Sequence, residues 1–495
     1  MELYWGDIHN HCSITYGYGS LKNALAAARK QLDFCAITAH AMWPDIPDKT
    51  PELAYLVDFH EKGFNKIRNT WEAVKKEIES ANVDGEFITF QGFEIHSSKY
   101  GDHHIISPDY GLELLYENTP RDAATRQKVR TILIPHHVGY TPGYRGANWN
   151  AFDQSISPVV EVYSKHGCAM NDQVSFPYYH TMGPRDGRGT VYAGLAAGKK
   201  FGFVASTDHH AGFPGSFGDG KMAVLANGKT KEDIWDAILQ RRTYAVTGEK
   251  IACGFSMNGA HFGAAAERCR DINIAWNVIA ADFIDKIVIY KNLNPIHIVN
   301  GEYLPDSVQD RRCKVRVEFG WGNFNEPFLW EIDVTVGNGA ILSVETCFRG
   351  KSVLAPSVDM ADDCEINGFK ANIVQQTEHF VSVVCETFKN VSTLHSQTSA
   401  FILELDFGAD TFLNFRINNR TEQISLQQLF NHSMTRHIGK YNSQAYKIHR
   451  AVPHTKYHAE GTLSDKSHQK SGDFYHMEVR QANGNMAYVS PVFCE

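Results

Sequence analysis

The stretch Tyr4-Trp5-Gly6-Asp7-Ile8-His9-Asn10-His11 begins as a strand-like run and ends in a His-x-His pair. Alternate residues of a strand face the same way, so we expect His9 and His11 to project to one side, where both imidazoles can reach one metal ion. The pattern recurs, because other short apolar runs also end in metal-ligating residue types: His40, Glu94, His104, His136 and Asp208-His209-His210. A barrel of parallel strands presents a metal site at its C-terminal rim in this way.

Length and composition limit the class of protein. The chain has 495 residues, which indicates two or three domains, and its 43% hydrophobic and 21% charged residues are typical of a soluble globular protein. A formal net charge of -8 and the lack of any run of Lys and Arg predict no nucleic-acid partner. No apolar segment approaches the ~20 residues of a membrane helix, and no secretory segment precedes the first strand. The ten cysteines form no CxxC pair, so we expect reduced thiols and a cytoplasmic protein.

The N-terminal half alternates helix-like and strand-like segments. Helical spacing predicts helices over Leu21 to Gln31 and roughly over Phe64 to Ser80. Strands are expected at 34–40, 86–94, 131–136, 159–163 and 203–208. Continuous apolar runs between helices indicate a parallel sheet that is covered on both faces. Six or seven such units predict an α/β, barrel-like domain over residues 1–248.

The pattern of polar and apolar residues changes after Gly248. Short strands with alternating polarity are expected at 271–276, 286–290, 314–319, 474–480 and 486–492. The last two are separated by Asn483-Gly484, a hairpin-type turn. Residues 249–495 are therefore predicted to form a mainly antiparallel, sandwich-like β domain that packs against the first half.

The ordered set Asp7-x-His9-x-His11, Thr38-Ala39-His40, Glu94, His104, His136 and Asp208-x-His210 resembles the PHP (polymerase and histidinol phosphatase) domain family. The resemblance covers residues 4–210 and implies a distorted (β/α)7 barrel, distantly like the amidohydrolases. Members of the family bind two or three metal ions at the C-terminal rim and are mostly phosphoesterases. Val159 to Gly167 and Arg242 to Gly248 resemble a branch of the family with an added C-terminal β domain.

The resemblance also implies a set of metal ligands. It assigns a first metal to His9, His11, Glu94 and Asp208. Glu94 would bridge to a second metal, completed by His104, for which His103 is the competing candidate, and by His136. Imidazoles and carboxylates without a thiolate cluster suit Zn, Mn or Fe.

A third metal site is incomplete in this sequence. Its ligands would be His40, His210 and an acidic or His residue five or six positions after His11. The segment Cys12 to Gly17 contains neither a carboxylate nor an imidazole. We therefore expect two divalent ions, or a third held weakly by His40 and His210 with water.

Residues near the predicted rim are candidates for contact with substrate. Lys165 and His166 follow a strand end, and His209 or His166 could protonate a leaving group, which makes these three the candidate catalytic residues. Arg145 and Arg185 lie in Gly- and Pro-rich loops, and a guanidinium suits phosphate or carboxylate. With His137 they are candidate substrate-binding residues. Each of these residues also has an equally simple structural explanation. Arg145 and Arg185 would then be solvated loop residues, and Lys165 would belong to a salt-bridged loop.

Together these observations predict a metal-dependent hydrolase, with phosphoesterase activity as the leading reaction. A metal-bridging hydroxide would attack a small-molecule phosphate ester. Two alternatives stay open. One is hydrolysis or elimination at a C–O or C–N bond of a carbohydrate or amide, which the incomplete third site favours. The other is a degenerate, non-catalytic barrel that acts as a binding module. The residues of the C-terminal half do not decide whether it shapes the pocket, binds carbohydrate or forms a homo-oligomer contact.

Overall fold

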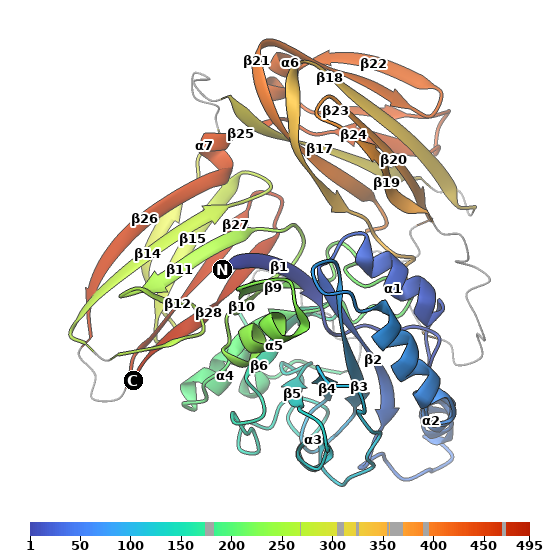
Figure 1. The fold of residues 1–495 in the computed structure, drawn as a ribbon, viewed down its shortest axis with the longest axis vertical. Helices are drawn as coiled ribbons and strands as arrows, with labels where there is room; N and C mark the ends of the chain where they lie inside the picture. Colours follow the sequence, from blue (N-terminus) through green and yellow to red (C-terminus); the bar gives the residue numbers. More distant parts are fainter. Residues whose placement is uncertain are drawn as a thin grey trace.

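The computed structural model of the protein describes residues 1–173, 183–267, 269–303, 311–322, 326–353, 356, 370–389, 396–467 and 472–495. In these residues the fold is mixed α/β, with large sheets, one long helix and several short helices. Figure 1 shows the N-terminal half at lower right, with the β-rich C-terminal half above it and to its left. Within the described ranges, no helix is both long enough and apolar enough to cross a membrane.

The N-terminal half contains most of the helices, and α1 and α2 pack on one side of its central strands (Figure 1). Its helices are α1 (Leu21–Arg29), α2 (Ala54–Ala81), α3 (Pro120–Thr125), α4 (Val191–Ala196) and α5 (Lys231–Leu239), with a 3₁₀ turn at Gly187–Gly189. Its strands are β1 (Glu2–Asp7), β2 (Phe34–Met42), β3 (Ile88–Ile95), β4 (His103–Ser107), β5 (Ile132–Pro135), β6 (Val159–Ser164), β7 (Gly167–Cys168), β8 (Gly202–Ala205), β9 (Lys221–Ala226) and β10 (Thr243–Val246). The predicted helices and strands occur at these places, although α2 begins well before Phe64.

The directions of the strands correct one expectation. Strands β1, β2 and β3 pair in parallel, as do β6 and β8. However, β4 is antiparallel to β3 and β5, and β9 is antiparallel to β1 and β10. The expectation of a wholly parallel sheet is therefore wrong. The seven residues between β3 and β4 are too few for a crossover, which needs a dozen or more. Strands β4 and β5 are buried along their whole length, so their sequences have the apolar runs typical of parallel strands. The (β/α)7 barrel itself stays a prediction.

The C-terminal half is built almost entirely of antiparallel strands, as predicted. A nine-stranded sheet contains β17 (Arg312–Trp321), β18 (Phe328–Cys347), β19 (Ala371–Gln376), β20 (Phe380–Thr387), β21 (Ser399–Ile417), β22 (Arg420–Ser425), β23 (Met434–His437), β24 (Ala445–Ile448) and β25 (Val452–Pro453). A four-stranded sheet contains β11 (Ala252–Met257), β12 (Ala260–His261), β14 (Asp271–Ile279) and β26 (His458–Lys466). The helices here are α6 (Leu426–Asn431) and α7 (His454–Tyr457).

The remaining strands join the two halves. They are β13 (Ala265–Ala266), β15 (Ile284–Lys291), β16 (Asn294–Asn300), β27 (Phe474–Gln481) and β28 (Met486–Cys494). Because β28 pairs with β10, the sheet that begins at β5 continues through β1 into the C-terminal strands. Gly484, at a φ of 90°, lies in the tight turn between β27 and β28, where the hairpin was predicted. The division of the chain into domains at residue 248 stays a prediction.

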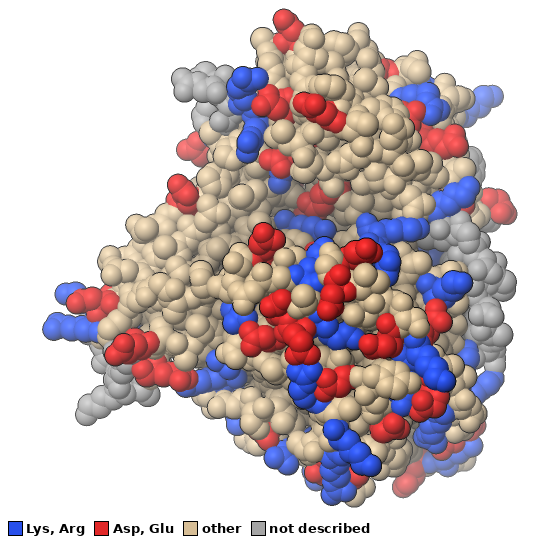
Figure 2. All heavy atoms as spheres, viewed as in Figure 1, with Lys and Arg blue, Asp and Glu red and all other residues tan. Residues whose placement is uncertain are grey.

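A loop of the C-terminal half reaches the part of the N-terminal half that follows Asp208. The N–H of Phe217 donates to the carbonyl of Phe348 at 2.9 Å, and the N–H of Gly350 donates to the hydroxyl of Ser216 at 3.3 Å. On the face drawn in Figure 2, acidic and basic side chains are interleaved over the N-terminal half. The candidate site lies among buried side chains.

Candidate metal centre

Strand register places three of the predicted ligands in one row. His40 of β2 pairs with Glu94 of β3, and Glu94 pairs with His104 of β4. Directly paired residues have side chains on the same face of a sheet, so these three groups are neighbours. His136 follows the last residue of β5, at the next strand along. All four side chains are buried.

Two loops complete the cluster. Strand β1 ends at Asp7, so His9 and His11 do not lie in the strand as expected but in the loop after it. That loop runs beside the loop after β8: Asp208 N–H donates to His9 O at 2.7 Å, and His11 N–H donates to His209 O at 2.9 Å. The buried carboxylate of Asp7 accepts hydrogen bonds from the N–H groups of His9, Thr207 and Gly215 and from the Thr207 hydroxyl. These bonds fix both loops that carry the predicted ligands.

Glu94 is the centre of the cluster. Its Oε2 lies 3.3 Å from Nε2 of His9, 3.3 Å from Nε2 of His11 and 3.0 Å from Nδ1 of His40. Its Oε1 lies 3.1 Å from Nε2 of His136 and 3.3 Å from Nδ1 of His96. Burial by itself raises the pKa of Glu94, but the surrounding imidazoles lower that pKa well below its usual range. The group is therefore an anion that faces five imidazoles.

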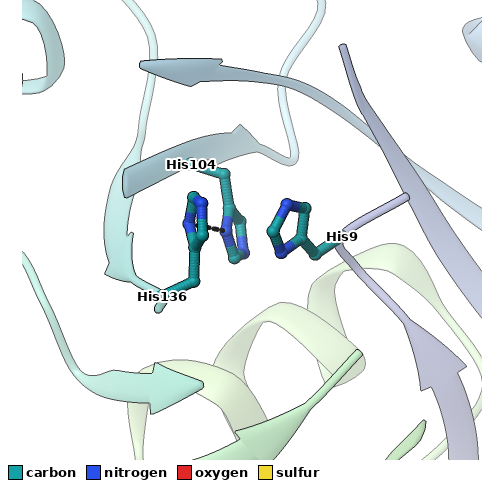
Figure 3. Close-up of side chains that lie close together, drawn as sticks. All are labelled: His9, His104 and His136. Atoms are coloured by element: carbon teal, nitrogen blue, oxygen red, sulfur yellow. Dashed lines mark hydrogen bonds between the residues drawn. The ribbon is translucent and has the colours of Figure 1, made fainter. Parts of the chain in front are cut away.

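The imidazoles converge closely enough to share a metal ion. Figure 3 shows His9, His104 and His136 around one point, with Nδ1 of His104 and Nδ1 of His136 at 3.4 Å. One ligand atom from each of these three lies within 4.8 Å of the others, and the same holds for the set His9, His11 and Asp208 and for the set His11, His40 and His210.

The donor atoms fit divalent metal ions. Two buried ring nitrogens, Nε2 of His104 and Nδ1 of His11, have no hydrogen-bond partner among the described residues. An unsatisfied buried nitrogen is costly in the protein alone and is satisfied by ligation. Imidazole and carboxylate donors are those that Zn, Mn and Fe use. Nε2 of His40 lies 3.1 Å from Nε2 of His210, so this pair is also arranged to share an ion.

Asp208 connects the cluster to its more exposed edge. Its Oδ1 lies 3.0 Å from Nε2 of His11, while its Oδ2 lies 3.3 Å from Nε2 of His137 and 3.1 Å from Nε2 of His166. The side chain of His166 is 21% exposed, in contrast to the buried ligands. Asp208, His137 and Arg145 have φ angles of 50°, 52° and 69°, which non-glycine residues seldom adopt. Such backbone conformations cluster at functional sites.

Other predicted residues lie further from Glu94. His209 accepts a hydrogen bond from Ala211 N–H through Nδ1, and its Nε2 lies 4.0 Å from Asp219. Lys165 is half-buried on the turn after β6, and its backbone N–H donates to Thr207 O. The backbone of Arg185 pairs with that of Tyr140, whose ring contacts His137.

His103, the alternative to His104, faces away from the cluster. It is adjacent to His104 in β4, and successive strand residues point to opposite faces. Its Nδ1 donates to Gly101 O at 2.8 Å. Burial lowers the pKa of His103 to about 4, so the ring is neutral at physiological pH.

A network beside Glu94 was not identified in the sequence. Arg145 donates to Asp102 at 2.6 Å and lies 2.7 Å from Nδ1 of His96. The Tyr16 hydroxyl lies 2.9 Å from Nε2 of His96, and the Tyr16 ring stacks on His40 at 4.1 Å. Tyr16 therefore occupies the segment where a third-metal ligand was sought. His96 lies just past the end of β3, two residues after Glu94, so its residue type and its place beside a candidate ligand were visible in the sequence.

Glu161 is a second residue whose role the sequence did not reveal. It is buried in β6, and its Oε2 lies 2.9 Å from Nδ1 of His9. A carboxylate in this position orients the imidazole so that Nε2 is presented to a metal. Burial raises the pKa of Glu161 to about 7, although the neighbouring His9 opposes this shift.

We expect the variant Glu161→Gln to bind divalent metal about 10- to 100-fold more weakly than the wild type, because an uncharged amide holds His9 less firmly. Competition against a chelator of known affinity measures the change. Glu61→Gln, at an exposed position of α2, is the matched control and should bind metal like the wild type. Equal metal affinity in Glu161→Gln and wild type would contradict the orienting role.

Comparisons with known proteins place the chain among uncharacterised relatives. No family model matches it. An uncharacterised protein of Chlamydia pneumoniae is 23% identical over 280 residues, which cover 51% of this chain and 44% of that protein. An uncharacterised protein of Chlamydia trachomatis is also 23% identical, over 290 residues that cover 53% of this chain and 42% of that protein. A third, from Chlamydia muridarum, is 22% identical over 290 residues. The matches thus span less than half the length of these relatives.

One solved structure matches this chain over most of the length of both proteins, but the structural similarity is low. It is a two-domain protein from Bacteroides vulgatus that contains a predicted PHP-like metal-dependent phosphoesterase. The identity is 13%, and the match covers 86% of this chain and 95% of that one, with a TM-score of 0.31. At that score the likeness carries no weight for this chain, and the inference of function below depends on the site.

Proposed function

We propose that this chain is a PHP-type metal-dependent hydrolase whose main reaction is hydrolysis of a small-molecule phosphate ester. The observation that carries the proposal is the position of Glu94, a buried anion within 3.3 Å of five imidazoles that come from four segments of the chain. A carboxylate in a purely structural ion pair needs only one partner. A carboxylate that bridges two metal ions is surrounded by several further donors, as Glu94 is by its imidazoles.

The described side chains divide into two ligand sets. His9, His11, Glu94 and Asp208 would hold one ion, and Glu94, His104 and His136 a second. His40 and His210 would hold a third only weakly, because an aromatic ring, that of Tyr16, lies beside them. Divalent ions in such sites supply Lewis acidity, which polarises a phosphoryl oxygen and makes water acidic enough to act as a nucleophile near neutral pH.

The protein groups around the ions have separate tasks in this proposal. His166 is partly exposed and is held by Asp208, so it is placed to donate a proton to the leaving oxygen of the ester. Arg145 is partly buried beside Asp102 and Trp43 and keeps its charge, which would attract an anionic substrate. His137 contacts Asp208 beside His166 and would contact the substrate from the same side. His209, Lys165 and Arg185 are proposed to act from the loops around the rim.

Metal content per chain, followed by a substrate panel, tests the proposal. We expect about two equivalents of Zn, Mn or Fe in protein purified without chelator. In the best metal, the protein should release phosphate from at least one small phosphate ester. The panel also contains unphosphorylated sugars and amides, because the incomplete third site favours C–O or C–N bond hydrolysis as the second candidate. Less than about half an equivalent after reconstitution would contradict both reactions and support a binding module.

A further inference from the structure

A cavity of about 280 Å³ lies behind the metal centre, on the face of β4 to which His103 points. Its walls are mostly apolar and come from the ends of the sheet and from the loop at 147–157. The main apolar wall residues are Tyr100, Leu133, Ala147, Trp149, Phe152 and Ile156. Small-molecule sites share this character, with apolar walls and a few well-placed polar groups.

The walls of the cavity are held in place by packing. The ring of Trp149 stacks on Phe201 at a centroid distance of 5.4 Å, and its indole N–H donates to Gly189 O. At the edge of the cavity Arg121 and Asp153 form an ion pair at 2.9 Å, so their charges offset each other. The cavity therefore exists before a ligand arrives. Its lining also includes Asp122, a second carboxylate, so the cavity does not suit an anionic ligand.

His103 supplies a polar group from the strand side of the cavity. The side chain is 9% exposed, and Nδ1 donates to the carbonyl of Gly101 at 2.8 Å. A carbonyl can only accept, so Nδ1 carries a proton, and in the neutral ring Nε2 keeps its lone pair. His103 thus offers one hydrogen-bond acceptor to a mainly apolar space, whose other polar lining residues are Thr119, Arg121, Asp122, Asn148, Asp153 and Ser157.

We propose that this cavity binds a small, mainly apolar ring compound that donates one N–H or O–H group to Nε2 of His103. The volume is at the small end of the range for ligand pockets and fits a one- or two-ring molecule. The site is separate from the metal centre, although the residues that follow His103 and Pro135 in the chain, His104 and His136, belong to that centre. The proposal does not depend on the reaction proposed above.

The test compares indole with 1-methylindole as probes of the full-length chain, by ligand-observed NMR titration. Indole has the N–H donor and 1-methylindole lacks it. We expect saturable binding of indole, about 10-fold tighter than that of 1-methylindole, as one hydrogen bond predicts. His103→Phe keeps the shape of the ring but removes the acceptor, and it should abolish the preference.

Two further variants make the result specific to the cavity. Ala151 lines the cavity but is exposed, so Ala151→Trp should fill the space without disturbing the core and eliminate saturable binding of both probes. Lys128→Trp adds the same side chain at an exposed position outside the cavity lining and should bind like the wild type. Binding of indole to Ala151→Trp with wild-type affinity, or no saturable binding by the wild type, overturns the site. A preference for indole that persists in His103→Phe reflects the size of the methyl group and overturns the hydrogen bond.

Discussion

The variant Glu94→Gln should lose bound metal from both ligand sets and at least about 100-fold in hydrolytic activity. Changes to groups that merely orient a ligand cost 10- to 100-fold in metal affinity or activity, and a shared ligand should cost more. The substitution keeps the size of the side chain but removes the negative charge that faces His9, His11, His40, His96 and His136. Metal analysis of the purified variant and phosphate release under saturating metal measure the two effects.

Two companion variants separate chemistry from folding. Glu86→Gln removes a carboxylate that is 69% exposed, and it should keep wild-type metal content and activity. Glu94→Asp retains the charge on a shorter side chain and should recover part of the metal binding. Full metal content in Glu94→Gln would show that Glu94 is not a ligand. Loss of activity with metal retained would point to a role in orienting substrate instead.

The sequence predicted the ends of β2, β3 and β5, with the candidate ligands His40, Glu94 and His136, well because apolar runs mark buried strands and polar residues at their ends are conspicuous. It did not predict the strand register, which places His40, Glu94 and His104 in one row. Register depends on packing between segments far apart in the chain. The contact between Glu161 and His9 is of this kind, because it joins residues that are 152 positions apart.

Alternation along a strand was a poor guide where the chain leaves regular structure. It was applied to His9 and His11, but β1 ends at Asp7. His137 was predicted to contact substrate, and its orientation depends on a left-handed backbone, which places its Nε2 3.3 Å from Oδ2 of Asp208. A positive φ angle in a non-glycine residue has no reliable sequence signal. The candidate residues were therefore detectable by type and order, while their orientations required the structure.

Mild acid should unfold this protein, with stability falling steeply below about pH 6.5. Burial lowers the pKa of His60 and His476 to about 3 and that of His103 to about 4. These rings stay neutral in the folded protein but take up protons in the unfolded chain below an ordinary His pKa of about 6.5. The unfolded state then binds more protons, so each such group removes about 1.4 kcal/mol of stability per pH unit. Burial raises the pKa of Glu161 and of Glu478 to about 7, so these two groups act in the opposite direction and offset part of the loss.

The variant His476→Phe measures how much the protonation of one buried histidine contributes to acid unfolding. His476 lies outside the metal centre, stacks on Tyr290 at 4.6 Å and has no hydrogen-bond partner for either ring nitrogen among the described residues. Phe preserves the aromatic packing, so the variant should match or exceed wild-type stability at pH 7.5. Below pH 6.5 it should gain about 1.4 kcal/mol on the wild type for each pH unit. Urea unfolding between pH 7.5 and 5 measures the difference, with exposed His432→Asn as the control. Parallel pH profiles of His476→Phe and the wild type would mean that the folded protein protonates His476, and burial would then not explain acid unfolding.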